Sequence, residues 1–117
     1  MIREPFSLEE INTILRKYTK DNVEISPHYQ KYLNEGKREI SVNEILNFLF
    51  EKRCYFVEKQ INSWIRYKMV YELSNKYDLV IVVKEEKAKI LKVVSAYKSD
   101  KRVKEKWKKI SESRMMK

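Results

Sequence analysis

The chain has 117 residues, a formal net charge of +9 and a hydrophobic content of 43%. This length supports one hydrophobic core, and the longest apolar run, residues 79–83, is far shorter than the roughly 20 residues of a membrane-spanning helix. One cysteine excludes an intrachain disulfide and fits a reducing compartment, while one glycine excludes a glycine-rich phosphate loop. We therefore expect a cytoplasmic protein with a single domain over residues 1–117 and no membrane partner.

Three helices are predicted in the first half of the chain. Residues 7–10 (SLEE) form a capping box, which predicts a helix over residues 7–19. Ser26 and Pro27 predict a second, short helix to about residue 34, which Gly36 would end. Residues 41–44 (SVNE) are another capping box and predict the third helix.

The hydrophobic pattern then changes to the period of two that is typical of strands. Strands are predicted over residues 54–58, 64–73, 77–84 and 88–97, with turns at 74–76 and 85–87. A basic amphipathic helix is predicted over residues 99–117, because Val103, Trp107 and Ile110 recur at helical spacing among lysines.

Helices followed by consecutive strands predict an α+β fold. We expect N-terminal helices packed on one face of a three- to four-stranded antiparallel sheet, with a basic C-terminal helix. The first helix, within residues 1–22, would be an addition at the N-terminus.

The positive charge lies in the second half of the chain. Residues 1–65 contain ten Lys/Arg and ten Asp/Glu, whereas residues 66–117 contain sixteen and seven. A one-sided excess of this kind attracts polyanions, of which nucleic acid is the first candidate and an acidic protein the second. A solvated lysine-rich surface without a partner is the alternative.

Strand alternation predicts which side chains share a face of the sheet. Tyr67, Leu79 and Val93 belong to an apolar set that would face the helices. The opposite face would be an apolar floor with cations, formed by Arg66, Lys68, Val80, Val82, Lys84, Ile90, Lys92, Val94 and Lys98. Tyr97 is expected to point towards the helices unless a β-bulge turns it.

A face with these residues suits RNA. Lysine and arginine neutralise phosphates, and metal-free RNA cleavage needs a base, an acid and a cation that stabilises the phosphorane. The candidate catalytic residues are His28, Arg66, Lys68, Lys92 and Tyr97, and the candidate nucleic-acid contacts are Trp64, Lys84, Lys98, Lys101 and Arg102. One histidine and one cysteine give no metal site of their own, and no cofactor is expected. His28 at a helix start is also typical of a surface or capping residue.

Two segments of the chain resemble the RelE-like superfamily of small toxins and relatives, including the BrnT-like group. The first is SPHYQKYLNEGKREISVNEILNFL and the second is YDLVIVVKEEKAKILKVVSAY, and the resemblance covers roughly residues 26–98. It implies a helical layer on a curved antiparallel sheet and, in many members, metal-independent RNA cleavage that an antitoxin holds off. Arg66, Lys68 and Lys92 would match the basic strand residues, Tyr97 the terminal aromatic residue and His28 the helix-start histidine.

Three functions therefore remain open from the sequence. The first is an RNA-binding RelE-like protein that acts as a toxin-type endoribonuclease, on free or ribosome-bound RNA. The second is a non-catalytic module that binds nucleic acid, and the third is a protein-interaction domain that engages an acidic, antitoxin-like partner.

Overall fold

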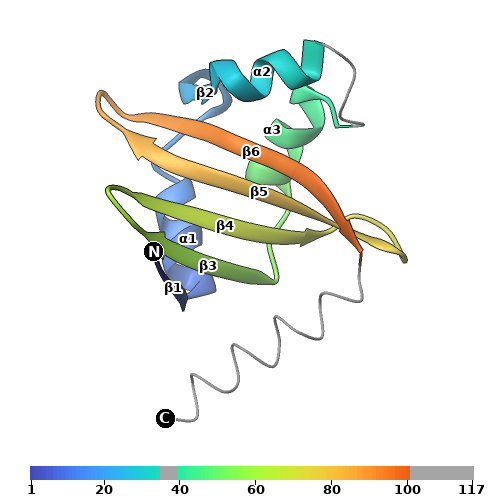
Figure 1. Cartoon of the computed structure of the whole chain (residues 1–117), viewed down its shortest axis with the longest axis horizontal. Coiled ribbons are helices and arrows are strands. Elements are labelled where there is room, and N and C mark those ends of the chain that lie inside the picture. The colour runs from blue at the N-terminus through green and yellow to red at the C-terminus, as the bar shows by residue number, and fades with distance from the viewer. Residues whose placement is uncertain (35–39, 101–117) are drawn as a thin grey trace.

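The computed structural model describes residues 1–34 and 40–100 of the chain, which form one sheet and three α-helices (Figure 1). The helices are α1 (Leu8–Leu15), α2 (Pro27–Asn34) and α3 (Val42–Glu51), with a short 3-10 helix, η1 (Lys20–Asn22). The strands are β1 (Ile2–Pro5), β2 (Val23–Ile25), β3 (Phe56–Ile61), β4 (Ile65–Glu72), β5 (Tyr77–Glu86) and β6 (Ile90–Asp100). In these described ranges no helix is long and apolar enough to cross a membrane.

The sheet has six strands in the order β1-β3-β4-β5-β6-β2. All neighbours are antiparallel except β2, which runs parallel to β6 with Val23 opposite Leu91. The predicted architecture, N-terminal helices on a three- to four-stranded antiparallel sheet, is therefore wrong. The sheet has six strands and is mixed, and more residues lie in strands than in the short helices. The two edge strands have only four and three residues, which is too short for alternation to reveal them.

Both predicted capping boxes mark real helix starts. The Ser7 hydroxyl accepts a hydrogen bond from the Glu10 amide at 3.3 Å. Ser41 and Glu44 bond reciprocally, at 3.1 Å and 3.3 Å. The first helix is shorter than predicted, because the Tyr18 amide bonds to Leu15 three residues back, which tightens and ends the last turn.

The predicted strands lie at shifted bounds, and the C-terminal prediction is largely outside the described residues. The strand expected over residues 54–58 spans 56–61, and the turn expected at 85–87 lies at 87–89. Ser99 and Asp100, where a helix was expected to begin, belong to β6, and Asp100 pairs with Tyr77. Residues 101–117 and Gly36 are outside the described part of the chain.

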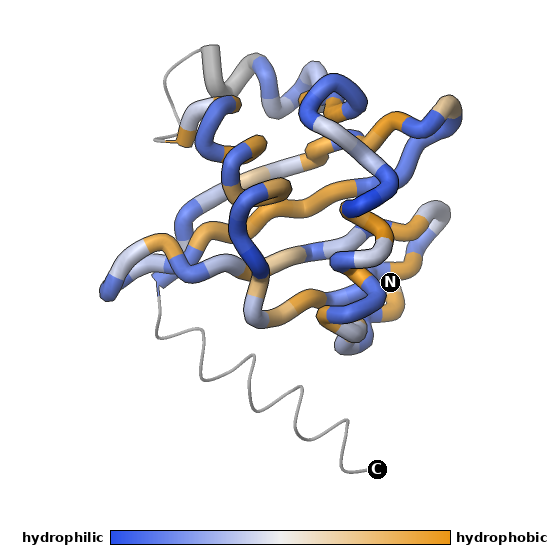
Figure 2. The backbone as a smooth tube through the Cα atoms, turned by 180° about the vertical axis from the view of Figure 1, so that it is seen from behind, coloured by the Kyte–Doolittle hydropathy of each residue, from blue (hydrophilic) through white to orange (hydrophobic). Residues whose placement is uncertain are grey.

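The main core lies between one face of the sheet and the helices. Apolar side chains of the helices, such as Ile11, Tyr29 and Ile45, pack with the inward-facing residues of β4, β5 and β6. Figure 2 shows hydrophobic stretches along the central strands, behind helices in which hydrophilic and hydrophobic residues alternate. Cys54 is part of this core, and burial raises the pKa of its thiol to about 11.

A β-bulge in β6 changes which residues share a face. Val82 pairs with Ser95 and Val83 with Val93, so Val94 is an additional residue in β6. Before the bulge the odd-numbered residues of β6 face the main core, as alternation predicts. After it the even-numbered residues do, and Ala96 is fully buried in that core.

The bulge corrects two of the predicted positions. Tyr97, which was expected to point towards the helices, packs instead against a second apolar cluster on the opposite face. Lys98, which was expected on that opposite face, pairs with Leu79 on the core side and lies with its ammonium 5.8 Å from the centroid of the Tyr77 ring. Lys98 is therefore separated from the other strand cations.

The face opposite the helices is not the bare apolar floor that the sequence predicts. Val80 is fully buried there, in a small apolar cluster. The cluster consists of Phe56, Val70, Val80 and Val82, and Tyr55, Val94 and Tyr97 pack against it. The Tyr55 hydroxyl donates a hydrogen bond to Asp78, whose carboxylate is also fully buried. Burial, followed by this bond, raises the pKa of Tyr55. In the described part of the chain, the other end of this face is open and carries a pocket.

Candidate phosphate-binding pocket

A pocket of about 370 Å³ lies at that open end of the face. Its cations come from three adjacent strands: Arg66 from β4, Lys84 from β5 and Lys92 from β6. Lys84 and Lys92 are direct cross-strand partners, so their side chains leave the sheet on the same side. We call these three residues with Ser26, His28 and Val94 the basic pocket.

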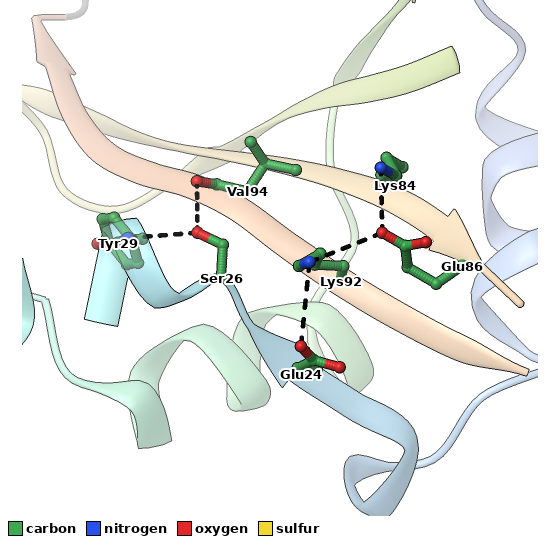
Figure 3. A network of polar contacts seen from close by, with 7 residues as sticks. All are labelled: Glu24, Ser26, Tyr29, Lys84, Glu86, Lys92 and Val94. Carbon is green, nitrogen blue, oxygen red and sulfur yellow. Dashed lines mark hydrogen bonds and ion pairs between the residues drawn. The ribbon is translucent and has the colours of Figure 1, made fainter. Parts of the chain in front are cut away.

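The remaining wall of the basic pocket comes from the junction between β2 and α2. β2 extends the sheet beside β6, and the Ser26 amide bonds to the Val93 carbonyl at 2.9 Å. The Ser26 hydroxyl accepts from the Tyr29 amide at 3.2 Å and lies 3.4 Å from the Val94 carbonyl, which it bonds as donor. These bonds of the Ser26 hydroxyl, drawn in Figure 3, fix the start of α2 at the sheet edge. The exposed His28 therefore also lines the pocket.

Two carboxylates balance part of the positive charge. Glu86 lies 3.0 Å from the Lys84 ammonium and 3.8 Å from that of Lys92, and Glu24 lies 4.0 Å from Lys92 (Figure 3). The hydrogen bond from Lys84 is the main cause that lowers the pKa of Glu86, with a further contribution from Lys92. Glu86 is therefore charged at neutral pH. The formal charges of three strand cations exceed those of the two carboxylates, so the group is net positive.

Arg66 is the pocket cation with a buried nitrogen that lacks a hydrogen-bond partner in the described residues. This nitrogen is Nε, and the side chain as a whole is half-buried. A buried donor that lacks an acceptor costs about 1–3 kcal/mol. Arg66 also lines the basic pocket, and guanidinium groups bind phosphate oxygens with directed hydrogen bonds.

Trp64 lies beside the basic pocket, in the loop between β3 and β4. Its ring centroid is 4.6 Å from the Lys84 ammonium and 6.0 Å from the Arg66 guanidinium carbon. Both distances fall within the range of cation–π contacts. Trp64 is nevertheless 51% exposed, so much of the indole surface stays open to solvent.

The structure therefore brings some of the predicted site residues together and leaves others apart. His28, Arg66, Lys84 and Lys92 line one pocket, with Trp64 at its side. Lys68 shares their face but lies one row further along the sheet, between Glu58 and Val82. Tyr97 belongs to the second apolar cluster and Lys98 to the other face, while Lys101 and Arg102 are outside the described residues.

Three residues of the site were missed from the sequence. Ser26 was interpreted only as a helix cap, and Glu24 and Glu86 were not assigned to the site. Glu86 gives a weak signal in the sequence, because it has the same strand parity as Lys84 and is two residues from it. Glu24 gives none, because its position depends on the pairing of β2 with β6 across more than sixty residues of chain.

The arrangement can bind one phosphate group and an adjacent planar group. Arg66, Lys84 and Lys92 can neutralise the phosphate. Ser26 and His28 can form hydrogen bonds with ligand groups next to the phosphate. The indole of Trp64 can contact an aromatic ring of the ligand.

Comparisons with known proteins identify a family for this chain. No curated protein and no solved structure matches it. Residues 9–83 match the MJ0788 family, a range that begins in α1, ends within β5 and includes Ser26, His28, Arg66 and Trp64. The match spans more than half of the chain, which therefore belongs to the MJ0788 family.

Proposed function

We propose that this protein binds RNA, with one backbone phosphate held in the basic pocket. The observation behind the proposal is the convergence of Arg66, Lys84 and Lys92 from three adjacent strands on one pocket. Lysines and arginines that only keep the protein in solution would be spread over the surface of the sheet and its edges.

The distribution of charge supports a polyanion as the ligand. The excess of Lys and Arg lies in residues 66–117, and all three strand cations of the basic pocket belong to that half. Each phosphate that such cations neutralise releases counterions, which gives binding that weakens steeply as salt increases.

The hydroxyl of Ser26 favours RNA over DNA. A serine hydroxyl has one donor and two acceptor sites, and here one acceptor binds the Tyr29 amide while the donor binds the Val94 carbonyl. The second acceptor site can take a hydrogen bond from a ribose 2′-hydroxyl, the group by which proteins distinguish RNA from DNA. His28 lies in the same wall of the basic pocket and can serve the same group.

The test compares Arg66→Gln with Lys76→Gln. Lys76 is an exposed lysine in the turn between β4 and β5, at the far end of these strands from the pocket, so both variants lose one charge. Binding of a labelled RNA is measured by fluorescence anisotropy in EDTA, with salt varied between about 50 and 200 mM. A charge-assisted hydrogen bond contributes about 1.5–3 kcal/mol, so Arg66→Gln should weaken binding about tenfold or more.

Arg66→Gln should also reduce the slope of log K against log salt by roughly 0.7–1, because one phosphate contact is lost. Lys76→Gln should leave the affinity within about twofold of the original. Equal affinities for the two variants would reject the basic pocket as the binding site. Tight binding of an acidic peptide, with none of RNA, would instead favour the protein-interaction function.

RNA cleavage is a second candidate, which the location of His28 favours. The imidazole lines the same pocket as Arg66 and Lys92, so a base and two cations could act on one phosphodiester. Product formation from RNA in EDTA, lost in His28→Ala but kept in Lys76→Gln, would support this function. Intact RNA after prolonged incubation would leave binding alone.

The relationship with the RelE-like superfamily, and with it an antitoxin-like partner and a cytoplasmic toxin function, stays a prediction. Lys68 and Tyr97 were predicted to be catalytic from the strand faces as well as from that resemblance, and both lie outside the basic pocket. The proposal of RNA binding depends on the pocket alone.

A further inference from the structure

We infer that the RNA bound by this protein is single-stranded and that one of its bases stacks on the indole ring of Trp64. This inference rests on the proposed binding of phosphate in the basic pocket and adds the class of nucleic acid that the site selects.

The first observation is the exposure of Trp64. The residue is in a tight loop, where the Asn62 amide bonds to the Trp64 carbonyl at 3.1 Å, and it is 51% exposed. A tryptophan that only closed the hairpin would bury its ring on the apolar side of the strands. Here the ring lies with the cations instead, and its free surface remains available to a second planar group.

The second observation is the short distance between the ring and the basic pocket. Lys84 lines the pocket and also has its ammonium 4.6 Å from the centroid of the Trp64 ring. Arg66, which also lines the pocket, lies 6.0 Å from the same centroid. Because the ring and the pocket share these two side chains, a nucleotide whose phosphate lies between the cations has its own or the next base within reach of the indole.

These two observations exclude a regular duplex as the preferred ligand. In a double helix the bases are stacked on each other and turned inward, so none can lie on an external ring without unpairing. In a single strand a base is free to stack on an aromatic side chain, and this contact accepts any base because every base has a π-face.

The test uses the full-length chain with Trp107→Phe, so that Trp64 is the one remaining tryptophan. The probes are a short oligouridylate, a duplex of the same length and sodium polyphosphate, which is a polyanion without bases. Oligouridylate should quench the emission of Trp64 at saturation. Polyphosphate should compete for the site but cause much less quenching.

Substitutions give the second part of the test. Trp64→Ala should weaken oligouridylate binding about tenfold, as expected for the loss of one base–aromatic stack, and Trp64→Phe should retain most of the affinity. Ile65→Ala is the matched control, because Ile65 is the next residue and is 42% exposed. Its parity in β4 is opposite to that of Arg66, so its side chain leaves the sheet on the face away from the basic pocket. This variant should bind like the unchanged chain.

Three results would overturn the inference: equal affinity of Trp64→Ala and Ile65→Ala for oligouridylate, equal quenching by polyphosphate, or tighter binding of the duplex. Its failure can be distinguished from that of the proposed function. If Arg66→Gln weakens binding while Trp64→Ala does not, the stacking alone is wrong; if Arg66→Gln also binds normally, the phosphate site is wrong as well.

Discussion

Lys84 and Lys92 lie directly opposite each other on β5 and β6, and both of their ammonium groups contact the carboxylate of Glu86. Two like charges at opposed positions of an antiparallel pair repel each other. Glu86 compensates for this repulsion when no ligand is bound. A phosphate that enters the basic pocket can replace this carboxylate as the counterion, so that Glu86 and the ligand compete for the same two lysines.

This competition predicts that Glu86→Gln binds RNA more tightly than the original protein. Removal of the carboxylate leaves both lysines free for phosphate, and we expect the affinity to rise several-fold. Glu51→Gln, which removes an exposed carboxylate at the end of α3, is the control and should change affinity little. Anisotropy titrations at equal salt measure both. Weaker binding by Glu86→Gln would show that Glu86 supports the site.

The same carboxylate predicts a pH dependence of folding stability. Lys84 and then Lys92 hold the pKa of Glu86 below its ordinary value of about 4.5. A carboxyl with a lowered pKa in the folded state stabilises the protein above the unfolded-state pKa, and this contribution is lost as the pH falls through the folded-state pKa. Glu86→Gln should therefore be less stable than the original at pH 7, and the difference should shrink below about pH 4.

Urea unfolding at a series of pH values measures this difference. Glu51→Gln, at an exposed position at the end of α3, is the control and should track the original protein across the series. A difference between Glu86→Gln and the original that stays constant down to about pH 3 would contradict the ion contacts of Glu86.

Tyr55→Phe should destabilise the protein by about 1–3 kcal/mol. The variant keeps the ring but removes the hydroxyl that donates to the fully buried Asp78. The second carboxylate oxygen of Asp78 has no hydrogen-bond partner in the described part of the chain, so loss of Tyr55 leaves the buried group with little compensation. The free energy of unfolding in urea gives the measurement.

Tyr77→Phe is the control for this prediction, because Tyr77 is 43% exposed and should change stability by less than about 0.5 kcal/mol. In the background Asp78→Asn the effect of Tyr55→Phe should be smaller, since the partner is no longer a carboxylate. Additive effects of the two changes would mean that the contact does not contribute.

Ala88→Gly should stabilise the protein. The turn between β5 and β6 places Ala88 at φ 64° and Lys89 at φ 57°, in the left-handed region where a side chain clashes with the backbone. Glycine has no such clash, and we expect a gain of about 0.5–1 kcal/mol after its larger unfolded-state entropy is counted. Thermal and urea unfolding measure it. Ala96→Gly, at a fully buried β-strand position, should destabilise the protein instead.

The features that could be predicted from the sequence depend on residues close together in the chain. The starts of α1 and α3 followed from capping boxes, in which Ser7 with Glu10 and Ser41 with Glu44 are three residues apart. The alternation of β4 and β5 placed Arg66 and Lys84 on one face, and the register confirms it. In each case the determining contact or periodicity spans only a few residues.

The features that were missed depend on contacts between distant segments. β1 pairs with β3 and β2 with β6, and each edge strand is too short to show a pattern of its own. The bulge at Val94 has no glycine or proline beside it in the sequence to mark it, yet it moves Tyr97 to one face and Lys98 to the other. One additional residue reverses the parity of every residue that follows it.

The helix starts, the order of the four long strands and the common parity of the strand cations follow from the sequence, because caps and periods act locally. The pairing of β2 with β6 arises in the folded chain, and so does the pocket in which His28 and Ser26 meet Arg66, Lys84 and Lys92 without Tyr97. A local pattern fixes the direction in which a side chain leaves its own strand. The neighbours it meets are fixed by long-range pairing and register, for which burial of the whole core selects.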